Sequence, residues 1–173
     1  MVAITVIALA VVIFRYRNAS NQRRAAEAQA ALGRARTVLT QLQSILLLPS
    51  ADPEQIAIRR EQLNAETLAE LGEVLADSDD NNAVLRAEAY ATRGDLFWTM
   101  GNAPVYPQAT TRPALATKEP AESLLKDAAA DYQKVIADYP NQKIAWVTAE
   151  FGLAAIAENQ HDWDAAAKRY HEV

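Results

Sequence analysis

The stretch DAAADYQKVIADYPNQ, residues 127–142, decides the fold predicted for this chain. Ala128, Tyr132 and Val135 follow one another at steps of four and three residues, which places them on one face of an α-helix. Pro140 ends that helix, because proline cannot donate the backbone hydrogen bond that would continue it. We expect the alanine to lie where a neighbouring helix crosses at close range, and the tyrosine to fill the gap between adjacent helix pairs.

The same three residue types recur near the end of the chain, in AAAKRYHEV. Ala166, Tyr170 and Val173 repeat the pattern at an interval of 38 residues. A period of roughly 34 to 40 residues is typical of proteins built from stacked pairs of antiparallel helices. The predicted fold class is therefore all-α, with helix hairpins stacked as an α-solenoid.

Helical periodicity extends over most of the remaining chain. Apolar residues at three- and four-residue steps predict a long hairpin over residues 18–78, with a divergent repeat as the alternative interpretation. They also predict further helix pairs over 79–173, with the last pair continuing beyond Val173. A proline-rich loop at 101–122 interrupts the second part. The expected helices cover residues 18–48, 53–76, 83–100, 121–138, 142–160 and 162 onward. Asp52 is the expected N-cap of the second helix.

The composition fits packed helices and limits the function. Half of the residues are hydrophobic and only 5 are glycine, which suits a helical core. The formal net charge of −5 argues against a nucleic-acid-binding protein. The chain has no cysteine, which excludes disulfides, thiolate metal ligands and a cysteine nucleophile. The sequence carries no phosphate loop, nucleophile elbow or zincin motif, so we predict no cofactor.

The first residues, MVAITVIALAVVIF, carry no charge and are followed at once by arginines. Residues 2–13 are apolar around the whole helix, and arginine and tyrosine at 15–17 suit the boundary of a bilayer. We interpret residues 1–17 as a transmembrane anchor, with a cleaved signal or a buried helix as alternatives. The uncharged run covers roughly 21 Å of the ~30 Å that a bilayer core requires, so we expect upstream residues to complete the span.

The helix pairs resemble the tetratricopeptide repeat family over about residues 82–173. Ala128, Tyr132, Val135 and Pro140 match four positions of the second helix of its repeat. Arg93 departs from the pattern, since it stands where the family has leucine. The residues that match the family's first helix are Tyr90, Gly94 and Phe97 in one unit, and Leu153 and Ala154 in the next. The resemblance implies that all these residues hold the repeats together.

The junction FRYRNASNQRRAAEAQAAL, residues 14–32, is similar to that of the ancillary translocon-subunit (YfgM-like) family and of other envelope repeat proteins. In those families one span is followed by repeats in the periplasm. The arginines after the span, taken alone, would instead keep the helices on the cytoplasmic side. We expect export, and hence a single-pass protein of the inner membrane with a periplasmic helical domain.

The run DSDDNNAVLRAE, residues 77–88, is a candidate calcium loop. Asp77, Asp79, Asn81 and Glu88 fall at positions 1, 3, 5 and 12 of such a loop, and their oxygen atoms suit calcium. Position 6 is Asn82 instead of the usual glycine. We prefer the alternative that these residues cap the helix that begins near residue 83, where acidic groups favour the helix dipole.

An enzyme is a second alternative. It would require the 101–122 loop to close over Asp95, Glu150 and His161, but nothing except loop length supports this, and we interpret Asp95 as a solvated helix residue. His161 and His171 have no partner at ligand spacing, so we expect surface histidines. The candidates for a ligand cage are Trp98, Trp146 and Trp163, whose spacing is more typical of packing between repeats.

We therefore expect a protein that is not an enzyme and that binds other proteins as a scaffold or adaptor. The inner surface of a helical solenoid is suited to holding a peptide or a helix. The anchor would hold this surface at a membrane, with a chaperone-like or secretion-associated role. The alternative is a structural homo-oligomer in which the hairpin at 20–76 pairs between chains.

Overall fold

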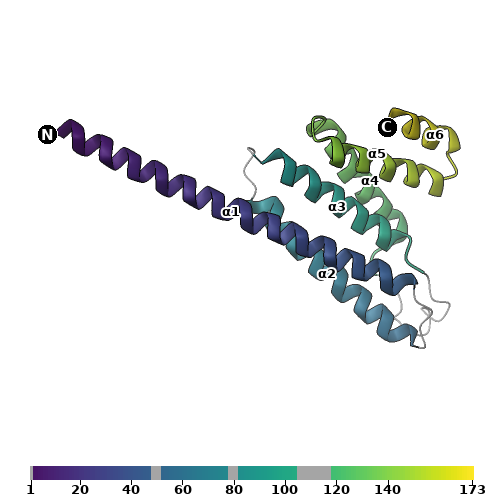
Figure 1. Ribbon diagram of the computed structural model, residues 1–173. Helices are drawn as coiled ribbons and strands as arrows, with labels where there is room; N and C mark the ends of the chain where they lie inside the picture. The colour runs from purple at the N-terminus through teal and green to yellow at the C-terminus, as the bar shows by residue number, and fades with distance from the viewer. Residues whose placement is uncertain (1, 48–51, 78–81, 105–117) are drawn as a thin grey trace.

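The structure is a computed structural model that describes residues 2–47, 52–77, 82–104 and 118–173, with the backbone alone at 2–14, 17 and 77. The described part is all-α, and its helices pack in sequential antiparallel pairs (Figure 1). The six helices of this part are α1 (Val2–Leu47), α2 (Pro53–Asp77), α3 (Ala83–Gly101), α4 (Ala121–Asp138), α5 (Lys143–Asn159) and α6 (Trp163–Glu172).

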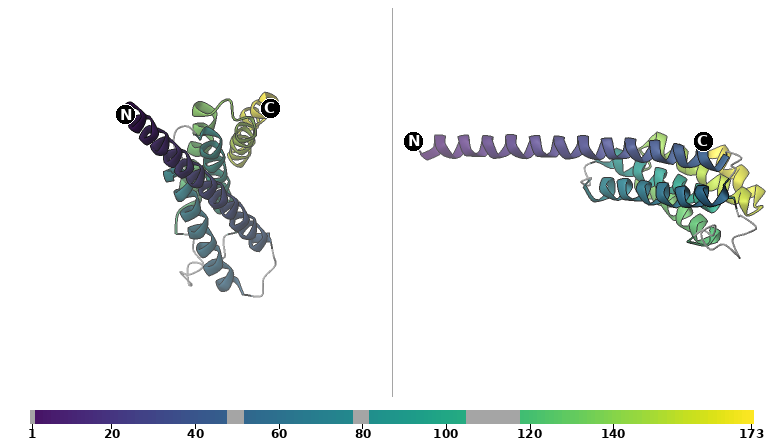
Figure 2. Two further views of the ribbon diagram at one scale, coloured as in Figure 1. Left: turned by 60° about the vertical axis from the view of Figure 1, so that its left-hand side comes forward. Right: turned by 90° about the horizontal axis from the view of Figure 1, so that it is seen from below.

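The helix α1 joins the predicted anchor and the first arm of the predicted hairpin into one continuous helix. Its N-terminal part projects beyond the other helices, whereas its C-terminal part packs along α2 (Figures 1 and 2). Across the described residues, no helix is both long enough and apolar enough to span a bilayer. The apolar side chains of residues 1–14, on which the predicted anchor depends, lie outside the described part.

The start of α1 apart, the sequence predicted the helix ends closely, since each predicted end lies within one residue of the end in the structure. Asp52 is the predicted cap of α2, and its Oδ1 accepts the backbone N–H groups of Glu54 and Gln55 at 3.0 and 3.4 Å. Asp162 caps α6 in the same way, by accepting the N–H of Ala165 at 3.0 Å. Of the predicted loop at 101–122, residues 105–117 lie outside the described part.

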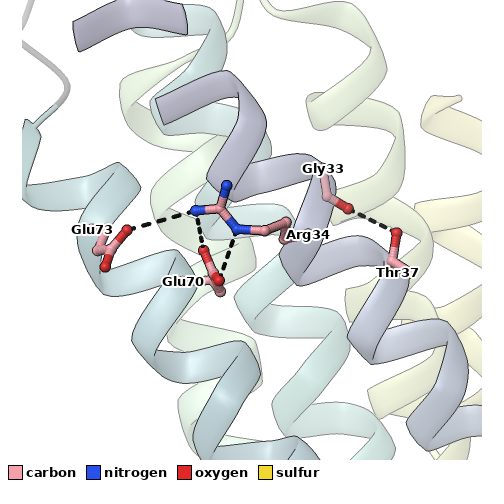
Figure 3. Close-up of polar contacts among 5 residues, drawn as sticks. All are labelled: Gly33, Arg34, Thr37, Glu70 and Glu73. Atoms are coloured by element: carbon pink, nitrogen blue, oxygen red, sulfur yellow. Dashed lines mark hydrogen bonds and ion pairs between the residues drawn. The ribbon is translucent and has the colours of Figure 1, made fainter. Parts of the chain in front are cut away.

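The hairpin of α1 and α2 has an apolar seam and a polar outer edge. Leucines, alanines and a valine fill the seam, where Ala35, Leu42, Leu63, Leu71 and Val74 are fully buried. On the edge, the Arg34 guanidinium pairs with Glu70 at 2.7 Å and reaches Glu73 at 3.8 Å (Figure 3). Both carboxylates belong to α2, so this contact ties the two arms together. The pair also lowers the pKa of the Glu70 carboxyl.

The ring of Tyr132 is the centre of the second core. It is buried between α3 and α5, where it lies against Gly94 on one side and Gly152 on the other. A Cβ atom at Gly94 would lie 2.6 Å from the ring, and one at Gly152 would lie 2.3 Å from it. Neither position therefore tolerates a side chain while the ring stays in place. Tyr132 accordingly fills the gap between helix pairs, as the sequence predicted.

Small residues allow α3 and α4 to approach closely. Ala128 of α4 is fully buried in one cluster with Ala87 and Ala91 of α3, and Val135 joins the same cluster. This packing agrees with the role predicted for Ala128 at a close helix crossing. Because α4 contacts both α3 and α5, it holds the second pair against the third.

The first helix of each pair contacts the first helix of the next pair. The helix α3 packs against both α1 and α5, and the three helices line one surface of the stack. We call this surface the inner face. Gln43 and Thr99 connect α1 to α3 by a hydrogen bond of 3.4 Å, and Asn159 donates to Asn102 near the C-terminal end of α3 at 2.8 Å.

The third pair is less covered than the second. Ala166 is buried, as its counterpart Ala128 is, but Tyr170 and Val173 are 40% and 49% exposed. The Tyr170 ring contacts the Phe151 ring at a centroid distance of 5.8 Å. Within the part of the chain that the structure describes, no helix lies over Tyr170 in the way that α5 lies over Tyr132. The packing role predicted for these two residues is thus only partly fulfilled here.

Candidate interaction surface

A hollow of about 360 Å³ opens on the inner face, between α1, α3 and α5. We call it the inner hollow. It combines charged, hydroxyl and apolar side chains, and its most exposed apolar residue is Ile144 at 77%. The lining residues are Arg36, Leu39, Thr40 and Gln43 from α1, Glu88, Ala91, Thr92 and Asp95 from α3, and Ile144, Ala145 and Thr148 from α5.

Asp95 is a half-buried carboxylate in the lining of the inner hollow. Its Oδ1 accepts a hydrogen bond of 2.7 Å from the Tyr132 hydroxyl, so the carboxylate connects the hollow to the core. Burial raises the pKa of the Asp95 carboxyl to about 6, against the opposing effects of that hydrogen bond and of the Arg36 charge. The prediction that Asp95 is a solvated helix residue is therefore wrong, because helix α4 places a buried hydroxyl beside it.

The ion pair of Arg36 and Glu88 lies at one end of the inner hollow, with 3.0 Å between the guanidinium nitrogen and the carboxylate oxygen. The same two residues line a second hollow of about 370 Å³ between α1 and α3, which also includes Val84. The two hollows therefore adjoin at this ion pair. Val84 is 49% exposed, so each hollow has one exposed aliphatic side chain.

The residues that resemble tetratricopeptide positions lie in the packing between helices. Phe97 packs between the core of the hairpin and that of the second pair. Leu153 and Ala154 are buried in α5, and Pro140 follows the end of α4. Tyr90 stacks on Tyr139 with a centroid distance of 6.2 Å.

Arg93 departs from the leucine of the family pattern, and the structure supplies the reason. Its Nε and Nη2 atoms donate to the two carboxylate oxygens of Asp131, each at 2.7 Å, and the guanidinium lies over the Tyr90 ring. Asp131 is 5% exposed, so the cation is required to balance a buried charge. Asp131 was not predicted from the sequence, although an unexpected arginine at a core position indicated that an acidic partner was required.

The third pair has a corresponding contact. Arg169 of α6 donates to the buried Glu150 of α5 at 2.8 Å. Arg169 lies 38 residues after Asp131, so the same position of both second helices carries a charge that pairs with the preceding helix. The signs are reversed between the two pairs. This correspondence extends the interval of 38 residues from apolar to charged positions.

The residues of the enzyme alternative lie in different surroundings. Asp95 bonds to Tyr132, Glu150 pairs with Arg169, and His161 lies exposed in the turn before α6 with its backbone φ at 60°. Among the described residues, no hydrogen bond or ion pair joins any two of them. The described residues also include no group of three histidine or acidic side chains arranged to hold a metal ion.

The calcium alternative depends mainly on residues outside the described part. Asp79 and Asn81 are outside it, and the side chain of Asp77 is not described. Glu88 pairs with Arg36. Asn82 precedes α3 as its N-cap but makes no side-chain capping hydrogen bond, so the capping role that we predicted is not fulfilled at this residue.

The three tryptophans do not converge on one site. Trp98 packs against the second core, and its Nε1 is buried with no hydrogen-bond partner in the described part of the chain. Trp146 is partly buried on α5, with the Lys143 amino group 5.7 Å from its ring centre. Trp163 is 62% exposed and contacts the His161 ring, so the packing role predicted for it is wrong.

The apolar seam of the hairpin is used within the chain. One cluster joins Ala28, Leu32 and Ala35 of α1 to Leu71 and Val74 of α2, and it extends to α3. This leaves the oligomer alternative without a specific supporting contact among the described residues.

Comparison of the chain with models of protein families, with curated proteins and with solved structures finds no match to any of them.

Proposed function

We propose that this chain is a scaffold of tetratricopeptide-like repeats that binds a segment of another protein along its inner face. The observation that carries the proposal is the inner hollow, to which α1, α3 and α5 all contribute side chains. A surface built from three successive first helices can follow a peptide or helix over several turns. The exposed Val84 and Ile144 supply apolar contacts along it.

The repeat character of the scaffold is supported by the correspondence at 38 residues. It relates Ala128 to Ala166, both buried, and Asp131 to Arg169, both paired to the preceding helix. Such correspondences arise when one helix-pair unit is repeated in sequence. The uncharged run at the N-terminus and the arginines after it support a membrane anchor, and the junction resemblance supports a periplasmic position for the helices.

Site-specific photo-crosslinking in cells tests the binding function. The variant Ile144→p-benzoylphenylalanine places the crosslinker on the inner face. The control variant Gln133→p-benzoylphenylalanine places it at an exposed position of α4 that does not line the inner hollow. We expect a discrete adduct with another protein at position 144 and none of the same mass at 133. Identical adducts at both positions, or none at 144, would contradict the proposal.

A further inference from the structure

The inner hollow has a distinct hydrogen-bonding character because its hydroxyl groups are oriented by their own helices. Thr40, Thr92 and Thr148 each donate to the carbonyl four residues earlier, at 2.9, 2.8 and 3.0 Å. Each threonine belongs to a different helix, and each hydroxyl proton is thereby used within its helix. The oxygen lone pairs remain available, so the three hydroxyls present acceptors to whatever enters the hollow.

The charges of the inner hollow do not cancel. Arg36 pairs with Glu88 at 3.0 Å, and its charge also favours the ionised form of Asp95, but the two carboxylates of the lining outnumber this one cation. Asp95 receives a hydrogen bond from the neutral Tyr132 hydroxyl, whereas the ion pair of Arg36 is made with Glu88. A carboxylate with a neutral donor on one oxygen retains its negative charge and further acceptor capacity.

From these contacts we propose that the inner hollow binds a basic side chain, lysine or arginine, of the partner segment, with Asp95 as its counterion. The three threonine oxygens accept the remaining N–H groups, and Ile144 and Ala145 contact the alkyl stem of the side chain. Such a side chain matches both the negative charge and the acceptor oxygens of the hollow, because an ammonium or guanidinium group is positively charged and has hydrogen-bond donors only. This inference rests on the proposed function and specifies which partner segments the inner face accepts.

The opposite choice, an acidic side chain held by Arg36, is less favoured by the geometry. Arg36 is already engaged by Glu88, and an incoming carboxylate would face both Glu88 and Asp95. It would also meet the acceptor oxygens of the three threonines, from which it gains no hydrogen bond. The net charge of −5 on the chain further disfavours an acidic segment.

The test is selection from a library of random nine-residue peptides against the purified full chain in mild detergent. We expect lysine or arginine to be enriched next to apolar residues. Asp95→Asn preserves the shape of the side chain and can still accept the hydrogen bond from the Tyr132 hydroxyl, but it removes the negative charge. We therefore expect the enrichment of basic residues to disappear and the selected peptides to bind this variant at least about tenfold more weakly. Asp127→Asn, an exposed position of α4 outside the hollow, should behave as wild type.

A second variant separates binding from folding. Thr148→Val keeps the shape of the side chain and removes one acceptor, so the selected basic peptides should lose affinity while circular dichroism stays unchanged. If the selected peptides lack basic residues, or if Asp95→Asn leaves the enrichment intact, the proposal of a cation site is wrong while the scaffold function stands. If no peptides are selected at all, both fail.

The pH dependence provides an independent measurement. Asp95 must be ionised to hold a cation, and its pKa near 6 places the change in an accessible range. At about pH 5 roughly a tenth of the carboxyl is ionised, so affinity for a selected lysine peptide should fall about tenfold from its value at about pH 7.5. The other charged or titratable groups that face Asp95 are Arg36 of α1, Glu88 of α3 and Tyr132 of α4, whereas α5 lines the hollow with none. An affinity that is constant over this range would overturn the assignment to Asp95.

Discussion

The contact of Tyr132 with two glycines predicts that Gly152→Ala destabilises the protein, although alanine favours helices. The added Cβ would lie 2.3 Å from Cζ and 2.4 Å from Cε2 of the ring. The ring cannot move away freely, because Gly94 contacts its other side and the hydroxyl is bonded to Asp95. Overpacking of a core costs about 1–3 kcal/mol, and we expect the upper end here. The gain in helix propensity returns up to about 1 kcal/mol, which leaves a net loss of about 2 kcal/mol.

The assay is thermal and urea unfolding of the full chain, followed by far-ultraviolet circular dichroism. For a chain of this size a loss of about 2 kcal/mol lowers Tm by roughly 4–8 °C. Gly72→Ala is the matched control, since nothing lies within 4 Å of a Cβ at that position, and it should stabilise by about 0.5–1 kcal/mol. In a Tyr132→Leu background the cost of Gly152→Ala should vanish. If Gly152→Ala is as stable as Gly72→Ala, or costs the same without the ring, the reasoning is refuted.

Three further predictions follow from other contacts. Arg93→Met leaves the buried Asp131 carboxylate unpaired and should lower the free energy of unfolding in urea by about 2 kcal/mol. The control Lys134→Met breaks an exposed pair with Asp138 and should lower it by less than about 0.5 kcal/mol. The Asp95 pKa is about 6 in the folded protein and ~3.9 in the unfolded chain, so the folded state binds the proton more tightly. The stability of the wild type should therefore fall relative to that of Asp95→Asn as pH rises from about 4 to about 6, by at most ~3 kcal/mol. Parallel pH profiles of the two proteins would argue against this. Asp52→Ala should cost about 1 kcal/mol through loss of the α2 cap, and an unchanged urea midpoint would exclude that capping role.

The helices could be predicted because each carries its own signals. The periodicity of apolar residues and the stop at Pro140 are local, and the ends of α4 were predicted to the residue. The packing site of the Tyr132 ring was predictable in part, since Gly94 and Tyr132 were both identified as packing residues from the sequence. Gly152 was missed because it lies one position before the residues that match the family pattern, where sequence alone does not indicate the contact.

The candidate surface was much less predictable. Asp95 looks like an ordinary helix residue in the sequence, and only the approach of α4 makes it a half-buried acceptor for the Tyr132 hydroxyl. The inner hollow depends on three helices that are distant in the chain, so no local motif marks Thr40, Thr92 and Thr148 as one group. Pairs such as Arg93 and Asp131 could have been inferred from the interval between repeats, because a charge at a core position requires a partner.

Binding of a protein segment along the inner face can be tested by a crosslinking scan over the three helices that form it. One exposed residue of each contributing helix, Thr40, Val84 and Ile144, is replaced in turn by p-benzoylphenylalanine, with Glu66 and Gln133 on α2 and α4 as outer-face controls. The account predicts that the same partner is captured at all three inner positions and at neither control. Capture of that partner at the controls, or at none of the inner positions, would contradict it.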